Sequence, residues 1–151
     1  MKLIGKGGLS RLLEYVQIVL MCVVLVLLVT LPWSITWITA RSSGDPFYAR
    51  YLVILTYSGI MAELILWQGR GILHNINHNR VFSRDTVRRL RVLAVESIVL
   101  AVFYLLTMFW MSKFFMAALF VVFVVFGSTL LVFAELFRQA TQYKEENDMT
   151  I

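Results

Sequence analysis

The sequence predicts an all-α membrane protein: an antiparallel four-transmembrane-helix bundle with cytoplasmic N- and C-termini. Three observations predict this fold. Of the 151 residues, 60% are hydrophobic and only 15% are charged, whereas a soluble domain is about half apolar and about a quarter charged. The apolar residues fall in four long blocks, and the basic residues gather in the segments that flank them. This composition excludes a water-soluble globular enzyme, a disordered chain and a disulfide-stapled secreted module.

The four apolar blocks are expected to form one membrane domain over residues 1–151. The predicted spans are about 15–36, 47–68, 92–111 and 114–137, joined by a loop at 69–91 and followed by a tail at 138–151. Each span gives roughly 30 Å of helix at ~1.5 Å per residue, which matches the hydrocarbon thickness. A lone strand in lipid would leave its backbone unpaired, so helices are expected. The first block is too long for an ordinary signal peptide and is interpreted as a retained span.

The distribution of lysine and arginine predicts the orientation. The N-terminal arm, the loop 69–91 and the tail hold eleven of these residues, and the opposite side holds only Arg41, Arg50 and Lys113. The positive-inside rule therefore places both termini and the loop in the cytoplasm of a multi-pass cell-membrane protein. The outer connections are short, so any large contact surface lies in the membrane or in the cytoplasm.

The loop 69–91 carries six arginines and one acid, Asp85. We expect it to be mostly helical, with the second span continuing to Asn77 and a new helix beginning after an N-cap at Ser83. The arginines fit attraction to anionic lipid at the cytoplasmic face, or a docking surface for an acidic partner or for the acidic tail. Direct nucleic-acid binding is not expected, because the loop lacks a recognisable motif. The candidate docking residues are Arg80, Phe82, Ser83, Arg84, Arg88, Arg91, Glu145, Glu146, Asp148 and Ile151.

Three acids lie within the predicted spans, and a carboxylate in lipid costs several kcal/mol unless it is paired or protonated. Arginines are close in sequence to all three acids, which favours a charge network that ties the second, third and fourth spans together. A proton-linked or ligand-binding role and simple snorkelling to the interface are the alternatives. The residues of this predicted network are Glu63, Glu96, Glu135, Arg70, Arg89 and Arg138.

No catalytic motif occurs in the chain, and we predict neither an enzyme nor a cofactor. His74 and His78 have the i, i+4 spacing of metal ligands, but two histidines make at most half a site, so no metal is expected. Small residues at Gly59 and Gly127 are interpreted as helix contacts, because they let backbones approach closely.

Two stretches of the chain carry a family resemblance. They are Arg80-Val81-Phe82-Ser83 followed by Leu90-Arg91, and Ala134-Glu135-Leu136-Phe137 followed by an acidic ending that closes with Asp148-Met149-Thr150-Ile151. With the four spans, they resemble an uncharacterised bacterial family of small four-helix membrane proteins, often encoded beside a Cro/C1-type helix-turn-helix regulator. The resemblance covers essentially the whole chain, although Thr86 stands where an asparagine is common.

The resemblance implies a regulatory pair, in which this membrane protein binds or sequesters a cytoplasmic helix-turn-helix transcription regulator. A DNA-binding face is basic, so it should prefer the acidic tail (Glu145, Glu146, Asp148) to the arginine loop. The alternative is a small oligomeric transporter, channel subunit or immunity-type membrane protein that uses the intramembrane glutamates. Four spans are few for a transporter, so this alternative needs a homo-oligomer.

Overall fold

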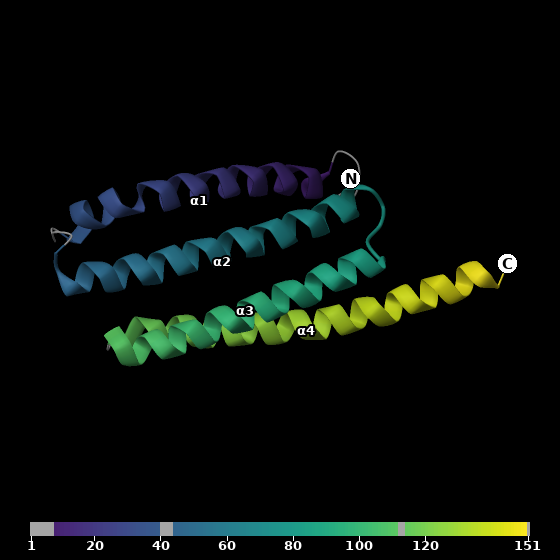
Figure 1. Cartoon of the computed structure of the whole chain (residues 1–151). Helices are drawn as coiled ribbons and strands as arrows, with labels where there is room; N and C mark the ends of the chain where they lie inside the picture. The colour runs from purple at the N-terminus through teal and green to yellow at the C-terminus, as the bar shows by residue number, and fades with distance from the viewer. Residues whose placement is uncertain (1–7, 40–43, 112–113, 151) are drawn as a thin grey trace.

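The computed structural model describes residues 8–39, 44–111 and 114–150, and all its regular elements are helices. They are α1 (Leu9–Thr39), α2 (Pro46–Asn77), α3 (Arg84–Met111) and α4 (Phe114–Met149) (Figure 1). All four are long and apolar enough to cross a membrane, which confirms the prediction of an all-helical, multi-pass membrane protein. Five residues used in the sequence predictions lie outside the described residues: Lys2, Lys6, Arg41, Lys113 and Ile151.

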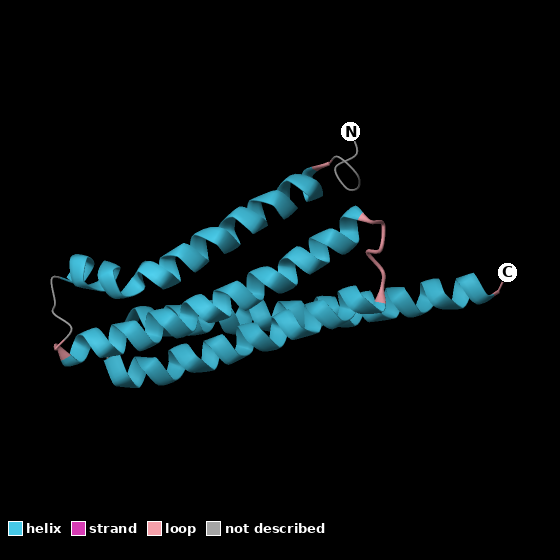
Figure 2. Ribbon diagram, turned by 45° about the horizontal axis from the view of Figure 1, so that its top comes forward, coloured by secondary structure: helices cyan, strands magenta, loops and turns pink. Residues whose placement is uncertain are grey.

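The helices pack in chain order. In the described part of the chain, α1 contacts α2, α2 contacts α3, and α3 contacts α4, with no contact between α1 and either α3 or α4. Figures 1 and 2 show α1 at one edge, lying against α2, with α4 running beside α3. The inner helix α3 therefore holds most of the buried residues, whereas α1 exposes most of its apolar side chains, such as Val29 at 71%.

The core lies between α2, α3 and α4. Met61 of α2 is buried with Leu100 and Tyr104 of α3, and aromatic rings from α4 pack against this cluster. The Tyr104 hydroxyl donates a hydrogen bond of 2.9 Å to the Ser58 hydroxyl, which joins α3 to α2. A polar link of this kind between helices is worth roughly 0.6 kcal/mol in membrane proteins.

Glycine allows the close approach of α3 and α4. A Cβ added at Gly127 would lie 2.7 Å from Cγ1 of Ile98 and 3.1 Å from the Ala94 carbonyl oxygen. Only a residue without a side chain fits this spacing, so the predicted packing role of Gly127 is confirmed.

The connection between α2 and α3 is short and tightly hydrogen-bonded. Asn79 adopts a left-handed backbone with φ of 58°, and the Arg80 amide donates to the Asn75 carbonyl across 2.8 Å. This pattern closes a helix C-terminus. The Ser83 hydroxyl then accepts from the Thr86 amide at 3.3 Å, which confirms the predicted N-cap of α3.

Helix α4 is longer than the membrane requires. Its 36 residues correspond to ~54 Å of helix at ~1.5 Å per residue, against ~30 Å of hydrocarbon. The predicted tail, residues 138–151, is helical as far as Met149. Figure 1 shows this end of α4 projecting past the ends of α2 and α3.

Candidate functional site

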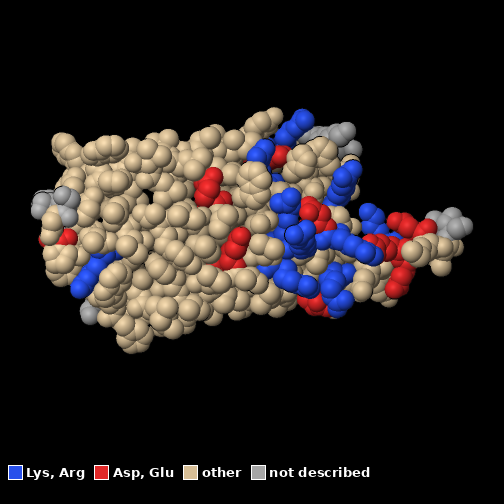
Figure 3. All heavy atoms as spheres, in the orientation of Figure 1, with Lys and Arg blue, Asp and Glu red and all other residues tan. Residues whose placement is uncertain are grey.

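Charged side chains gather at one end of the molecule. Figure 3 shows Lys and Arg concentrated where α4 projects, while most of the remaining surface is tan, with acidic side chains set into it. The residues that build this end come from the first turns of α1, the last turns of α2, the first turns of α3, and α4 beyond its predicted span. We call this region the charged end.

A chain of polar side chains links α2 to α3 at the charged end. Asp85 accepts hydrogen bonds from Arg89 Nε at 2.9 Å and from Asn75 Nδ2 at 2.8 Å. Arg89 Nη1 also donates to Gln68 Oε1 at 3.4 Å, and Gln68 hydrogen-bonds with Glu96. Arg89 and Glu96, which the sequence predicted in one network, are thus connected through an α2 glutamine. The hydrogen bonds from Asn75 and Arg89 hold the pKa of Asp85 below its ordinary value.

The remaining members of the predicted network are placed separately. Glu135 pairs with Arg138 within α4, at 2.9 Å between Nε and Oε2, and both side chains are nearly half exposed. One oxygen of Glu63 is buried, with no hydrogen-bond partner among the described residues, as is one oxygen of Glu96. The charge of Arg70 acts on Glu14 of α1 rather than on these acids. The ion pairs of the described chain therefore do not join the six residues into one network.

The tail and the start of α3 contact each other. Arg84 donates to both carboxylate oxygens of Glu145, at 3.0 Å from Nε and 2.9 Å from Nη2. The hydrogen bond from Arg84 lowers the pKa of Glu145. Nearby, the rings of Phe82 and Phe137 lie 5.5 Å apart between centroids. Two pairs, Arg84 with Glu145 and Phe82 with Phe137, thus join the start of α3 and the residues just before it to α4.

The other candidate docking residues differ in their surroundings. Ser83 is used as a helix cap, and the Arg80 carbonyl accepts a hydrogen bond of 3.2 Å from Thr86. Glu146 and Asp148 are exposed on the projecting end of α4. Arg88 and Arg91 are also exposed, and neither makes an ion pair or hydrogen bond within the described residues.

A polar cluster between α1 and α2 was missed by the sequence analysis. Ser10 donates to Asn77 Oδ1 at 2.6 Å, and Asn77 donates to Glu14 Oε2 at 2.5 Å. Glu14 Oε1 lies 3.2 Å from His74 Nδ1. The available signal was position: Glu14 just precedes the first predicted span, and Asn77 follows the second, so both lie at the same level. We call Ser10, Glu14, His74 and Asn77 the α1–α2 cluster.

The two histidines do not form part of a larger metal-binding group. Their rings stack with centroids 4.1 Å apart, and His78 Nδ1 lies 2.8 Å from the His74 carbonyl oxygen. Within the residues described, no set of three His, Cys, Asp or Glu side chains is placed to hold a metal ion.

Comparison with known proteins gives one match. A family model described as a protein of unknown function, DUF2975, matches residues 48–151, which include α3, α4 and all of α2 except its first two residues. Neither a curated protein nor a solved structure matches the chain.

Proposed function

The chain belongs to the DUF2975 family of unknown function, and from this premise we propose that it is a non-catalytic membrane protein that binds a cytoplasmic helix-turn-helix transcription regulator. The regulator is held at the bilayer through the connection between α2 and α3 and the tail. The single observation that carries the proposal is the projecting end of α4. A helix that continues well past its neighbours presents a surface that the membrane does not need.

The proposal places both termini in the cytoplasm, with the four helices antiparallel across the bilayer. Its support is the arginine excess at the charged end, because basic residues are retained on the cytoplasmic side. In a Cys22→Ser background, a cysteine at Asp85 or at Asp148 should resist a membrane-impermeant thiol reagent added to intact cells. Labelling of either position from outside would overturn this orientation.

The chemistry of the projecting end fits a basic partner. About 20 residues of α4 suffice to cross the hydrocarbon, so about 16 remain, or ~24 Å of helix. Glu146 and Asp148 are exposed on this segment, beside Tyr143 at 73% exposure and Met149 at 87%. Acids attract the basic face that a DNA-binding protein presents to phosphates, and an exposed tyrosine is a frequent anchor of protein interfaces.

Sequestration follows if the membrane protein binds the regulator through the same basic face that binds DNA. A regulator whose basic face is engaged by Glu146 and Asp148 cannot present that face to DNA. The membrane protein and the DNA then compete for one surface, and release from the membrane frees the regulator.

The proposal is tested by capture of a helix-turn-helix regulator of the kind that the family resemblance leads us to expect beside this gene. The full-length protein, purified in mild detergent, should retain the regulator, and a version that ends at Gln142 should lose it. A Glu146→Gln, Asp148→Asn variant keeps the helix and should also lose most binding. The matched control is Gln139→Ala with Asn147→Ala, which changes exposed side chains of α4 without removing charge. Equal recovery by all four proteins would refute a role of the tail.

A second candidate function is ion or proton transport by an oligomer. It is favoured by Glu63 and Glu96, each with a buried carboxylate oxygen that lacks a partner in the described chain, because unpaired acids at membrane depth mark ion pathways. Proton flux into liposomes should then fall in Glu63→Gln and Glu96→Gln variants, but not in Glu135→Gln. Equal flux in liposomes with and without the protein would remove this candidate.

A further inference from the structure

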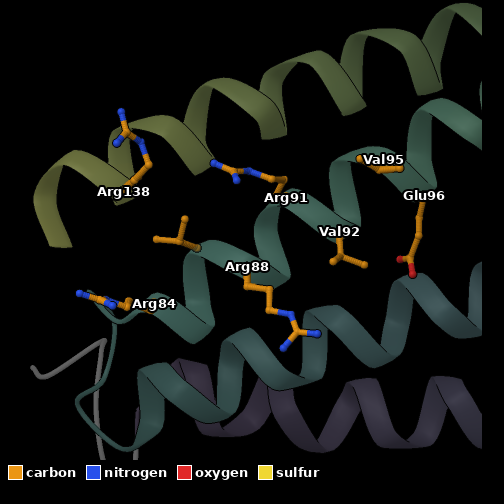
Figure 4. A pocket seen from close by; sticks show the side chains of 8 residues that line it. Arg84, Arg88, Arg91, Val92, Val95, Glu96 and Arg138 are labelled. Atoms are coloured by element: carbon orange, nitrogen blue, oxygen red, sulfur yellow. The ribbon is translucent and has the colours of Figure 1, made fainter. Parts of the chain in front are cut away.

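A groove opens along the first turns of α3, on the face of that helix that lies between α2 and α4 (Figure 4). Its volume is about 470 Å³, and Figure 4 shows Arg91 near the ribbon of α4, with Glu96 at the far end pointing toward α2. Four arginines and Val87 line the groove toward the charged end, and Val92 and Val95 line it toward the apolar part of the molecule. The lining residues are Arg84, Arg88, Arg91, Arg138, Val87, Val92, Val95 and Glu96.

The four arginines are not equivalent. Arg84 is paired with Glu145, and Arg138 is paired with Glu135. Arg88 and Arg91 make no ion pair or hydrogen bond with any residue that the structure describes, although their charges act on Asp85 and Glu135 respectively. The groove therefore has two guanidinium groups whose donors are free to bind an anion.

The apolar wall lies deeper along the same helix. Val92 follows Arg91 directly, and Val95 lies one turn further, ~6 Å from Arg91 along the axis. Val95 is half exposed, at 51%, so its side chain faces the groove rather than the core. Arginine at the rim with valine one turn below matches a phospholipid, in which a phosphate lies directly above acyl chains.

We propose that this groove binds an anionic phospholipid, with Arg88 and Arg91 on the phosphate and with Val92 and Val95 against the acyl chains. Guanidinium groups suit this ligand because they bind phosphate oxygens through two parallel hydrogen bonds. Inorganic phosphate offers the same anion but leaves the valine wall without a contact. The length of the groove along α3 therefore favours a phospholipid, rather than free phosphate, as the bound anion.

The test is native mass spectrometry of the full-length protein in mild detergent, with phosphatidylglycerol or phosphatidylcholine added. The unmodified protein should retain one phosphatidylglycerol in preference to phosphatidylcholine. An Arg88→Gln, Arg91→Gln variant should bind it roughly thirtyfold more weakly, from ~1 kcal/mol for each of the two basic residues near an anionic surface. Excess inorganic phosphate should not displace the lipid. Displacement at millimolar phosphate would overturn the lipid assignment.

The matched control also removes two arginines from the charged end, but neither of them lines the groove. Arg11 lines a separate cavity with His78, and Arg80 lies on the α2–α3 connection, so an Arg11→Gln, Arg80→Gln variant should bind phosphatidylglycerol normally. If both double variants lost phosphatidylglycerol binding equally, the lipid would be held by general attraction to the charged surface, and the assignment of the groove as its binding site would be overturned. A Val95→Phe variant keeps every charge and fills the groove, and it should also lose the lipid while its helical circular dichroism is unchanged. Normal binding by Val95→Phe would refute the acyl-chain contact.

Discussion

Arg84 and Glu145 are separated by 61 positions in the chain, yet their side chains pair through two parallel hydrogen bonds of 3.0 and 2.9 Å. The pair joins the first residue of α3 to the last turns of α4. Two exposed charges gain little stability from such a pair, because water and salt screen them. Its consequence is positional: it holds the projecting end of α4 beside the start of α3.

We predict that the carboxyl group of Glu145 titrates below its ordinary pKa of 4.5, since Arg84 stabilises its charged form. A pKa lowered in the folded state means that the pair contributes at neutral pH and is lost as the pH falls through that pKa. Carbon NMR of the Glu145 carboxyl group measures the midpoint directly. In an Arg84→Gln variant the midpoint should rise toward 4.5, whereas Arg80→Gln should leave it in place. Equal midpoints in the unmodified protein and Arg84→Gln would contradict the pairing.

Asn77 is predicted to attach the charged end of α1 to α2. It is 6% exposed and serves both Ser10 and Glu14, whereas α1 has no other helix partner in the described chain. An Asn77→Ala change should therefore lower the free energy of unfolding by about 1–3 kcal/mol, the usual cost of leaving buried polar groups unpaired. Denaturant titration in detergent measures this loss.

Hydrogen exchange locates the effect of the same change. The amides in the first turns of α1 should exchange faster in Asn77→Ala, and those of α3 should not. Asn147→Ala, at an exposed position of α4, is the control and should match the unmodified protein in both measurements. Unchanged exchange in α1 would show that the α1–α2 cluster does not hold this helix.

The helices and their ends were predictable from the sequence because they depend on local chemistry. A polar or charged residue in lipid is costly, so the apolar blocks define the spans directly. The end of α2 near Asn79 follows from a left-handed backbone at that asparagine, and the start of α3 follows from the Ser83 side chain, which caps a backbone amide. The extension of α4 through the tail to Met149 was less clear, since a run of charged helix formers also suits a frayed terminus.

The order of helices and the partners of the polar side chains were not predictable in the same way. A helix face against lipid is as apolar as a face against another helix, so α1 reads like a core helix although it contacts only α2. The link from Glu96 to Arg89 runs through Gln68 of α2. Sequence spacing identifies neighbours within one helix, as for Glu135 and Arg138, but carries no information on such contacts between helices.

Gly127 and Gly59 are predicted to respond differently to alanine. At Gly127 the added Cβ would meet the Ala94 carbonyl oxygen at 3.1 Å, and backbone cannot move aside. At Gly59 the nearest atoms belong to the end of the flexible Leu28 side chain, which can rotate. Gly127→Ala should therefore cost about 1–3 kcal/mol, as overpacking does. Gly59→Ala should be close to neutral, because alanine is the better helix former.

Thermal unfolding of the two glycine variants, followed by circular dichroism under one detergent condition, compares them directly. The paired design removes the general effect of alanine on helix propensity. If Gly59→Ala unfolded at a lower temperature than Gly127→Ala, the contact between α3 and α4 at Gly127 would not be tighter than the contact between α1 and α2 at Gly59.

The final prediction concerns the three intramembrane acids, which should separate into two classes on amide substitution. Glu63 and Glu96 each have a buried oxygen with no donor among the described residues, whereas both oxygens of Glu135 accept from Arg138. An amide at position 96 keeps an oxygen for Gln68 and removes a charge that lipid disfavours by several kcal/mol. Glu63→Gln and Glu96→Gln should therefore raise the free energy of unfolding, by at most the several kcal/mol that the charge costs in lipid, because the neutral amide is still buried without a partner. Glu135→Gln should lower it, because Arg138 loses its partner.

Denaturant titration of the three variants at neutral pH measures these changes in the free energy of unfolding. Lower stability in Glu63→Gln would show that this carboxylate has a partner in the membrane, such as a bound ion or a second copy of the chain, and would favour the transport candidate.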